Sequence, residues 1–178
     1  MHQATLEAFD MNGTALAPLE PETAARDCFP DHINADESLN ISMSVDVHAD
    51  ARRLFQALTM PEYIEAWIQI PGNSNDSMTV AAPEANGFRL DHYAAGRKSV
   101  SINSSYLFCH QRKMRMSWRK THEQSRADSV VDFRLRGNFG SSILELRHLA
   151  LPTADEHRWH QKLWLGSLAK LASLLRSA

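Results

Sequence analysis

The stretch VDVHADARRLFQALTMPEYIEAWI, residues 45–68, changes its hydrophobic period once, from that of a strand to that of a helix, and is then interrupted by a proline. Its first residues complete an alternation of apolar and polar side chains that starts upstream and predicts a half-buried strand over residues 41–47. Asp50 then stands at the position of a helix cap, and the apolar spacing after it is that of an amphipathic helix. Pro61 opens a second short helix, which carries Trp67. The folded part of the chain is therefore predicted to begin with one strand and two short helices.

Downstream, short runs of alternating character are separated by turn residues, which is the pattern of consecutive strands. The predicted strands lie at about residues 76 to 82, 87 to 93, 98 to 109, 112 to 119, 128 to 136 and 142 to 149. Their short spacings favour an antiparallel meander. A closing helix is predicted from about 155 to 176, because Trp164, Leu168 and Leu171 follow helical spacing. A sheet whose apolar face needs this one long helix as its cover belongs to the α+β class.

Length and composition indicate one globular domain. The chain has 178 residues, of which 43% are hydrophobic and 22% charged, and its mean hydropathy is −0.38. No apolar run has the length of a membrane span and the first ten residues show no targeting signal, so a cytoplasmic protein without a membrane span is expected. The net charge of −2 gives no reason to propose a nucleic-acid partner. Cys28 and Cys109 lack any metal or disulfide spacing and are expected to be free thiols.

The charge is unevenly distributed along the chain. Residues 1–40 carry eight acidic residues and one basic residue, a net of −7, which leaves +5 on the rest of the chain. The same segment contains three prolines and no sustained hydrophobic period. Residues 1–39 are therefore predicted to be an acidic, flexible extension, and residues 40–178 a single domain. An alternative is that the acidic segment lies on the basic surface of its own domain.

The order of these elements resembles the helix-grip fold of the START and birch-pollen-allergen (SRPBCC) superfamily. Within it, the sequence is similar to the family named after the activator of heat-shock-protein-90 ATPase. The resemblance covers roughly residues 40 to 176, and its fixed order of motifs supplies the specificity. The motifs are the opening stretch at 45–68, MRMSWR at 114–119, LELRHLAL at 144–151 and HQKLW at 160–164. The family's usual glycine before the helix tryptophan is replaced by Leu163, and the usual proline-containing approach to the tryptophan strand is missing. The resemblance implies a curved antiparallel sheet wrapped around the long C-terminal helix.

Strand alternation predicts which side chains face the interior. Phe108 is placed inside its long strand unless a bulge flips part of it, and Asp132 is placed outside. Polar groups recur on the apolar faces, at His92, Ser104 and His148 among others, which indicates a cavity with convergent polar groups. The predicted ligand-binding residues are Trp67, His92, Tyr106, Met116, Trp118, Phe133, His148, His160 and Trp164.

Each candidate also has a structural interpretation. His92, Tyr106 and His148 are candidates for acid–base catalysis, but a buried histidine is more often a hydrogen-bonded core residue. Met116 and Trp118 are explained as well by core packing as by ligand contact. No metal site and no cofactor are predicted, because the histidines lack a carboxylate or thiol pattern and the chain has no glycine-rich phosphate loop.

Three functions remain open. The leading hypothesis is non-enzymatic binding of a small hydrophobic or amphipathic molecule between the sheet and the closing helix. The alternative is an enzyme of the polyketide cyclase or aromatase kind, in which His92, Tyr106 or His148 moves protons. Regulation of a chaperone ATPase is implied only by the family resemblance, and in the activators that gave the name much of that function resembles the work of a separate N-terminal domain, which is not expected here. Pairing into a homodimer is also left open.

Overall fold

The computed structural model describes residues 39–72, 76–81, 86–122, 125–138 and 140–176. The predictions for the acidic extension and for Cys28 lie outside these residues. Within them, Cys109 is an exposed free thiol, as expected.

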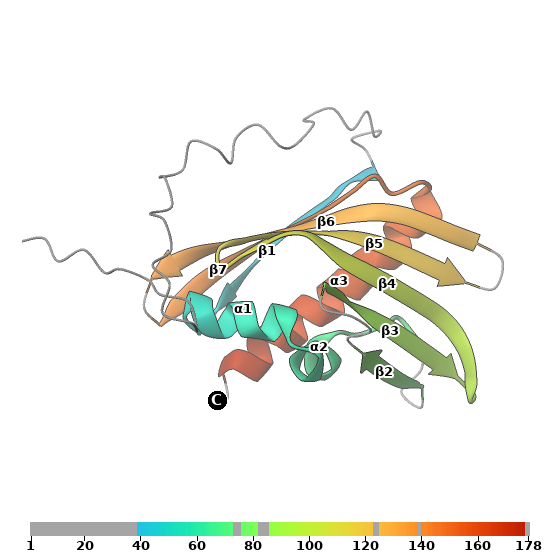
Figure 1. Cartoon of the computed structure of the whole chain (residues 1–178), viewed down its shortest axis with the longest axis horizontal. Coiled ribbons are helices and arrows are strands. Elements are labelled where there is room, and N and C mark those ends of the chain that lie inside the picture. The colour runs from blue at the N-terminus through green and yellow to red at the C-terminus, as the bar shows by residue number, and fades with distance from the viewer. Residues whose placement is uncertain (1–38, 73–75, 82–85, 123–124, 139, 177–178) are drawn as a thin grey trace, which may run out of the picture. The chain divides into compact units, whose positions relative to one another are not determined.

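Seven antiparallel strands and three helices form the α+β helix-grip fold that the sequence predicts. The sheet has the order β1-β7-β6-β5-β4-β3-β2, so every neighbour in the chain from β2 to β7 is also a neighbour in the sheet. The elements are β1 (Ile41–Val47), α1 (Ala51–Thr59), α2 (Pro61–Trp67), β2 (Ser77–Ala81), β3 (Gly87–Ala94), β4 (Arg97–His110), β5 (Lys113–His122), β6 (Ser125–Asn138), β7 (Ser141–Leu149) and α3 (Ala154–Arg176). The sheet curls around α3, with α1 and α2 beside the C-terminal half of that helix (Figure 1).

The helix boundaries follow from local chemistry. The Asp50 side chain accepts a hydrogen bond of 2.8 Å from the backbone N–H of Arg53 and so caps α1. Pro61 occupies the first turn of α2, where its missing N–H costs no helical hydrogen bond. Acidic Asp155 and Glu156 lie in the first turn of α3, where a negative charge interacts favourably with the helix dipole.

Of the described residues, none belongs to a helix with the length and apolar character that a membrane span requires.

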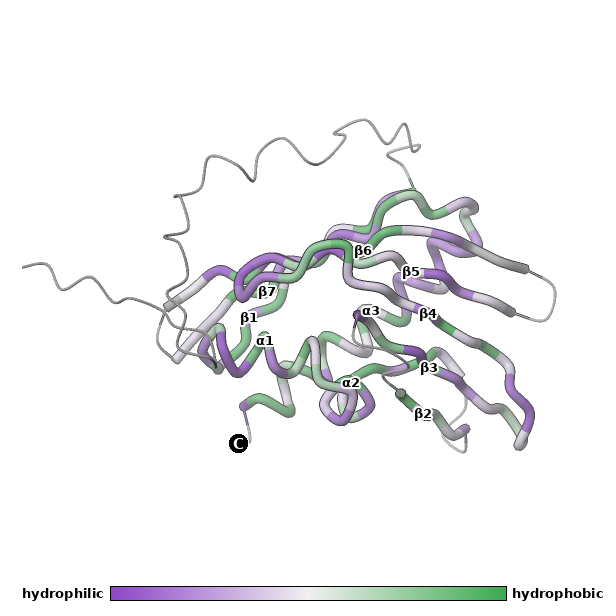
Figure 2. Tube along the Cα trace, viewed as in Figure 1, coloured by the Kyte–Doolittle hydropathy of each residue, from purple (hydrophilic) through white to green (hydrophobic). Residues whose placement is uncertain are grey.

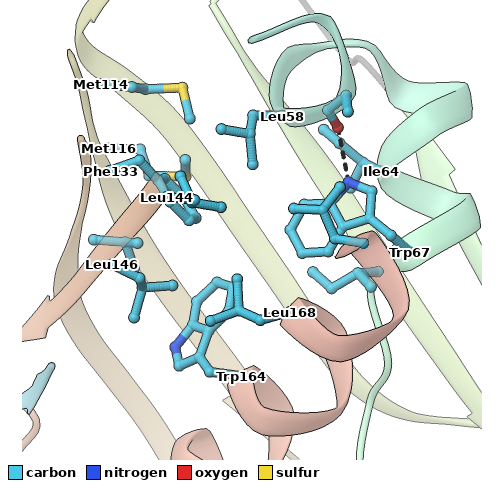
Figure 3. Packing of buried hydrophobic residues seen from close by; sticks show 14 of the residues in the cluster. Leu58, Ile64, Trp67, Met114, Met116, Phe133, Leu144, Leu146, Trp164 and Leu168 are labelled. Carbon is cyan, nitrogen blue, oxygen red and sulfur yellow. Dashed lines mark hydrogen bonds between the residues drawn. The ribbon is translucent and has the colours of Figure 1, made fainter. Parts of the chain in front are cut away.

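The concave face of the sheet and the facing stripe of α3 make one core. Hydrophilic and hydrophobic residues alternate along the strands (Figure 2), and the inward set of β5, including Met114 and Met116, is fully buried. These side chains pack with Phe133, Trp164 and Leu168, as Figure 3 shows. Burying one such large apolar side chain contributes about 1.5–3 kcal/mol, so this interface holds the helix against the sheet.

A bulge changes the face of one side chain, Phe108, whereas Asp132 lies on the predicted face with an unexpected burial. Phe108 is predicted inside unless a bulge flips part of its strand, and such a bulge between Tyr106 and Phe108 shifts the register and pairs Phe108 with outward-facing Arg115. Asp132 does lie on the outer face, but it is only 6% exposed, because the Arg115 guanidinium covers it with two hydrogen bonds of 2.5 and 2.7 Å. A charged residue on the outer face is thus buried by its partner.

Candidate functional site

Two fully buried histidines belong to one connected set of side chains between the sheet and α3. We call it the tryptophan–histidine cluster, and its members are Trp118, Ser129, His148, His160 and Trp164. Trp118 and Trp164 pack with their ring centroids 5.0 Å apart, and the two histidine rings meet edge to face at 4.5 Å. Both histidines are 0% exposed.

Three hydrogen bonds define the protonation of His148. Its Nδ1 accepts from the indole Nε1–H of Trp164 at 2.9 Å, so Nδ1 carries no proton. The Ser129 hydroxyl donates to the backbone carbonyl of Trp118 at 3.1 Å, so at 2.7 Å from Nε2 it acts as the acceptor. His148 is therefore the neutral Nε2–H tautomer, and both of its nitrogens are engaged.

His160 has the opposite tautomer for the same reason. Its Nε2 accepts from the indole Nε1–H of Trp118 at 3.1 Å, while its Nδ1 lies 2.8 Å from the backbone carbonyl of Glu156 and donates to it. The cluster thus has a partner for every ring nitrogen of the two histidines and for both indole N–H groups.

Burial keeps both imidazoles neutral. Burial holds the pKa of His148 well below its ordinary value, and the neighbouring His160 and His157 act in the same direction. Burial likewise lowers the pKa of His160 to about 4, although the Glu156 carbonyl and carboxylate oppose the shift. With no free lone pair and no exposed atom, His148 and His160 are placed to orient two tryptophans rather than to meet a substrate.

An open pocket of about 500 Å³ lies beside the first turn of α3, and we call it the α3 pocket. The ends of β3, β4 and β5, the chain after α2 and the start of α3 supply its walls. Its polar lining includes Asp76, His92, Ser99, Lys120, Asp155 and Glu156. Its apolar lining is Pro71, Ala94, Val100 and Trp159.

Lys120 is a buried cation on the floor of this pocket. It is 6% exposed, and its Nζ donates to both Glu156 carboxylate oxygens at 2.8 and 3.0 Å. Nζ also lies 4.1 Å from the centre of the Trp159 ring, within range of a cation–π interaction. The backbone carbonyl of Glu156 accepts a hydrogen bond from His160. Glu156 therefore links the α3 pocket to the tryptophan–histidine cluster.

His92 has polar partners on both sides of its ring. Its Nδ1 lies 2.7 Å from the Ser99 hydroxyl, and its Nε2 lies 3.5 Å from a carboxylate oxygen of Asp76. The His92 and Asp76 side chains are 8% and 9% exposed, so this pair is largely shielded from water. His92 is the one predicted ligand-binding residue among those that line the α3 pocket.

The other predicted residues lie elsewhere in the core. The Trp67 indole N–H donates to the carbonyl of Ala57 at 2.7 Å and ties α2 to α1 (Figure 3). The Tyr106 hydroxyl lies 3.4 Å from the Thr59 carbonyl, and burial raises its pKa to about 12. Met116 and Phe133 are buried in the core around Trp164.

The remaining lining residues of the α3 pocket were not predicted from the sequence. The inward position of Lys120 could have been predicted, since Lys120 continues by one step the alternation of Met116 and Trp118 along β5. No sequence pattern predicts the position of Ser99, because a register shift between β3 and β4 brings it to His92. Ser104 is on the inner face as predicted, and its buried hydroxyl has no hydrogen-bond partner among the described residues.

A second hollow, of about 360 Å³, lies on the outer face of the sheet. Its walls include Ser44, Asp132, Arg134 and Glu145. Asp132 is already bound by Arg115, and Glu145 lies 3.1 Å from Arg136, so ion pairs between strands account for this surface. Across the described ranges, His, Cys, Asp and Glu side chains do not gather in a group of three that could hold a metal ion.

Comparison with known proteins places this fold in a family. The family model described as "Activator of Hsp90 ATPase homolog 1-like protein" matches residues 48–176. Comparison with curated proteins finds no match.

Solved structures show the same fold at low sequence identity. Protein CV1439 from Chromobacterium violaceum is 19% identical with a TM-score of 0.67, over 78% of this chain and 97% of that one. CalU16 from Micromonospora echinospora is 20% identical with a TM-score of 0.54, over 76% of this chain and 75% of that one. DynU16, from the dynemicin biosynthetic locus, is 16% identical with a TM-score of 0.56, over 78% of this chain and 47% of that one.

Proposed function

The chain belongs to the family of activator of Hsp90 ATPase homolog 1-like proteins, and we propose that it binds a small amphipathic molecule in the α3 pocket. The observation that carries the proposal is the pocket itself. A volume of about 500 Å³ falls in the range of small-molecule sites, and its walls combine aromatic and aliphatic surface with a few fixed polar groups.

The apolar and the polar parts of the pocket lining would have different roles in binding. Trp159, Val100 and Ala94 offer apolar area, which supplies affinity by removing ligand surface from water. His92 and the Lys120–Glu156 pair place polar groups in fixed positions beside this apolar surface, which would orient a polar head group. An amphipathic ligand matches this division better than a purely apolar one.

The packing of the tryptophan–histidine cluster argues against a ligand site between the sheet and the middle of α3, and so supports the α3 pocket as the binding site. Trp118 and Trp164 occupy the space between the sheet and the middle of α3, and the polar atoms of His148 and His160 are committed to protein partners. A ligand there would have to displace packed aromatic side chains, whereas the α3 pocket is open to solvent. Regulation of a chaperone ATPase, the activity in the family's name, stays a prediction.

Native mass spectrometry of freshly purified protein tests the proposal. We expect a retained mass in the small-molecule range, to be identified after extraction. Ala94→Phe, which fills the pocket, should remove most of that mass. Ala169→Phe, on the exposed side of α3, is the matched control and should keep it. Equal retention by both variants would show that the ligand lies outside the α3 pocket.

If no molecule co-purifies, the same pair of variants can be compared with a library of amphipathic acids and amines in a thermal shift assay. A compound that binds the folded protein raises its melting temperature. The proposal requires at least one compound whose shift is lost in Ala94→Phe and kept in Ala169→Phe. A library in which every shift is the same in both variants contradicts it.

A further inference from the structure

We propose that Asp76, His92 and Ser99 form a carboxylate–histidine–serine triad, which activates the Ser99 hydroxyl for acyl transfer from small esters to water. The inference rests on the proposed function in one respect only, since it uses the same α3 pocket. It adds a reaction and a nucleophile to that pocket.

A β-bulge brings the serine to the histidine. His92 pairs with Val100, but the next residue, Tyr93, pairs with Lys98, so Ser99 is the extra residue of β4 at this point. In a regular strand Ser99 would face away from its inward neighbour Val100. The bulge turns the Ser99 hydroxyl to the His92 side of the sheet, where it lines the pocket. Bulges of this kind re-aim side chains and are frequent beside active sites.

The direction of the proton along the triad follows from Asp76. A carboxylate can only accept hydrogen bonds, so the His92 Nε2 that faces it at 3.5 Å carries the proton. In a neutral ring Nδ1 then has a lone pair, and the Ser99 hydroxyl at 2.7 Å donates to it. The competing acceptor for that hydroxyl, the His92 backbone carbonyl, is farther away at 3.3 Å. This is the arrangement in which a histidine can take the proton of a serine as the serine attacks.

Gly72 gives room for the Asp76–His92 contact. A Cβ at this position would lie 2.6 Å from the carboxylate of Asp76 and 3.3 to 3.4 Å from two ring atoms of His92. Any side chain there would therefore push the carboxylate away from the ring. Lys120 lines the same pocket, where its Nζ is paired with the Glu156 carboxylate.

The reaction balances without a cofactor. Ser99 Oγ bonds to the carbonyl carbon of the ester while its proton moves to His92 Nδ1 and an electron pair moves to the carbonyl oxygen. The adduct collapses, the bond to the alcohol oxygen breaks, and that oxygen takes the proton from His92 and leaves as the alcohol. Water attacks the acyl-serine by the same route, and its proton passes through His92 to Ser99 Oγ as the carboxylic acid leaves.

Two probes test the triad in the full chain. A fluorophosphonate bonds covalently to activated serines, and the modified residue is located by peptide mass mapping. Hydrolysis of p-nitrophenyl butyrate measures turnover. We expect labelling at Ser99 and turnover that falls at least 100-fold in both Ser99→Ala and His92→Gln. Ser101→Ala is the matched control, because the Ser101 hydroxyl donates to Asp91 at 2.7 Å without a histidine, and it should keep both signals.

Labelling and mass mapping are done on the parent protein, so their outcome does not depend on how the variants fold. Absence of labelling, or labelling confined to another residue, overturns the proposal. So does a Ser99→Ala variant that melts like the parent protein and hydrolyses the ester equally fast. A ligand retained in the α3 pocket by a protein that is never labelled would refute the triad and leave the binding function intact. Labelling at Ser99, together with equal ligand retention by Ala94→Phe and Ala169→Phe, would support the triad and refute binding of the ligand in the α3 pocket.

Discussion

His148 and His92 each lie 2.7 Å from a serine hydroxyl, yet the two hydrogen bonds run in opposite directions. In the tryptophan–histidine cluster, Ser129 gives its proton to a backbone carbonyl and accepts from His148. In the α3 pocket, the Asp76 carboxylate places the ring proton on the far side of His92, and Ser99 becomes the donor.

The comparison shows that a histidine–serine pair does not define a function by itself. The group bound at the other ring nitrogen sets the tautomer of the histidine, and the surrounding packing decides whether a small molecule can reach the histidine–serine pair. An indole N–H on one side and a carbonyl-bound hydroxyl on the other make His148 a fixed part of the core. A carboxylate and an open pocket leave the lone pair of His92 directed at a hydroxyl that a small molecule can approach.

The largest effect is expected from the core side of the comparison. Trp164→Ala should destabilise the protein by about 3–5 kcal/mol, because it removes a fully buried indole and leaves a cavity. Urea unfolding followed by circular dichroism measures the change. Trp159→Ala, at the half-buried pocket wall, is the control and should cost clearly less. A loss below about 1 kcal/mol for Trp164→Ala would mean that this residue lies outside the packed interface.

Acid should weaken the cluster. The pKa values of His148 and His160 are lowered in the folded protein, so the unfolded chain binds more protons as the pH falls. Their stabilising effect is complete above the ordinary pKa of about 6.5. It is lost as the pH falls from there, through the folded pKa of His160 at about 4 and beyond it for His148. Each unit of pKa difference corresponds to about 1.4 kcal/mol.

Unfolding free energies at several pH values between 7.5 and 4 test this, with His148→Gln/His160→Gln as the control. Glutamine offers a donor and an acceptor but does not titrate, so the double variant should lose less stability on acidification than the parent protein. The same slope in both proteins would assign the acid sensitivity to the carboxylates instead.

Removing one partner of the cluster should have an intermediate effect. His148→Ala leaves the Trp164 indole and Ser129 without their partner, a penalty of about 1–3 kcal/mol for buried polar groups in addition to the lost packing. His148→Gln should recover part of it. His92→Ala should cost less, because water in the α3 pocket can replace its hydrogen bonds. Chemical denaturation of the three variants ranks them, and an equal cost at positions 148 and 92 would contradict the contrast.

A small change in the pocket should affect chemistry and leave stability almost unaltered. In Gly72→Ala the new methyl group displaces the flexible end of the Asp76 side chain, which costs under about 1 kcal/mol for a residue near the surface. Fluorophosphonate labelling at Ser99 should fall, because His92 loses the carboxylate that orients it. Unchanged labelling at unchanged stability would mean that Asp76 takes no part in activating the serine.

The smallest effect is expected from deletion of residues 1–38. Both regions of the comparison lie within residues 40–178, and the acidic composition of the deleted segment indicates no core contribution. The melting temperature should stay within a few degrees, and ligand retention should not change. A large loss of cooperativity in the melting curve would show that this segment is an integral part of the domain.

The local pattern of the chain was sufficient to predict most of the architecture. The strands, the two short helices and the closing helix were predicted close to their observed positions. The Asp50 cap and the inner-face positions of His92, Ser104 and His148 were also predicted correctly. These features depend on the period of a few neighbouring side chains and on capping groups within one turn, so they can be deduced without knowing what packs against them.

The sites depend on relations between distant residues, which only the tertiary structure decided. Alternation could place His92 and His148 on inner faces but could not tell that one borders a pocket and the other lies under two tryptophans. The bulge at Ser99 is a property of the pairing between β3 and β4, and it moves one side chain across the sheet without a local signal. The tautomers follow from partners up to 42 positions away in the chain, since a hydrogen bond is set by which atoms meet in space.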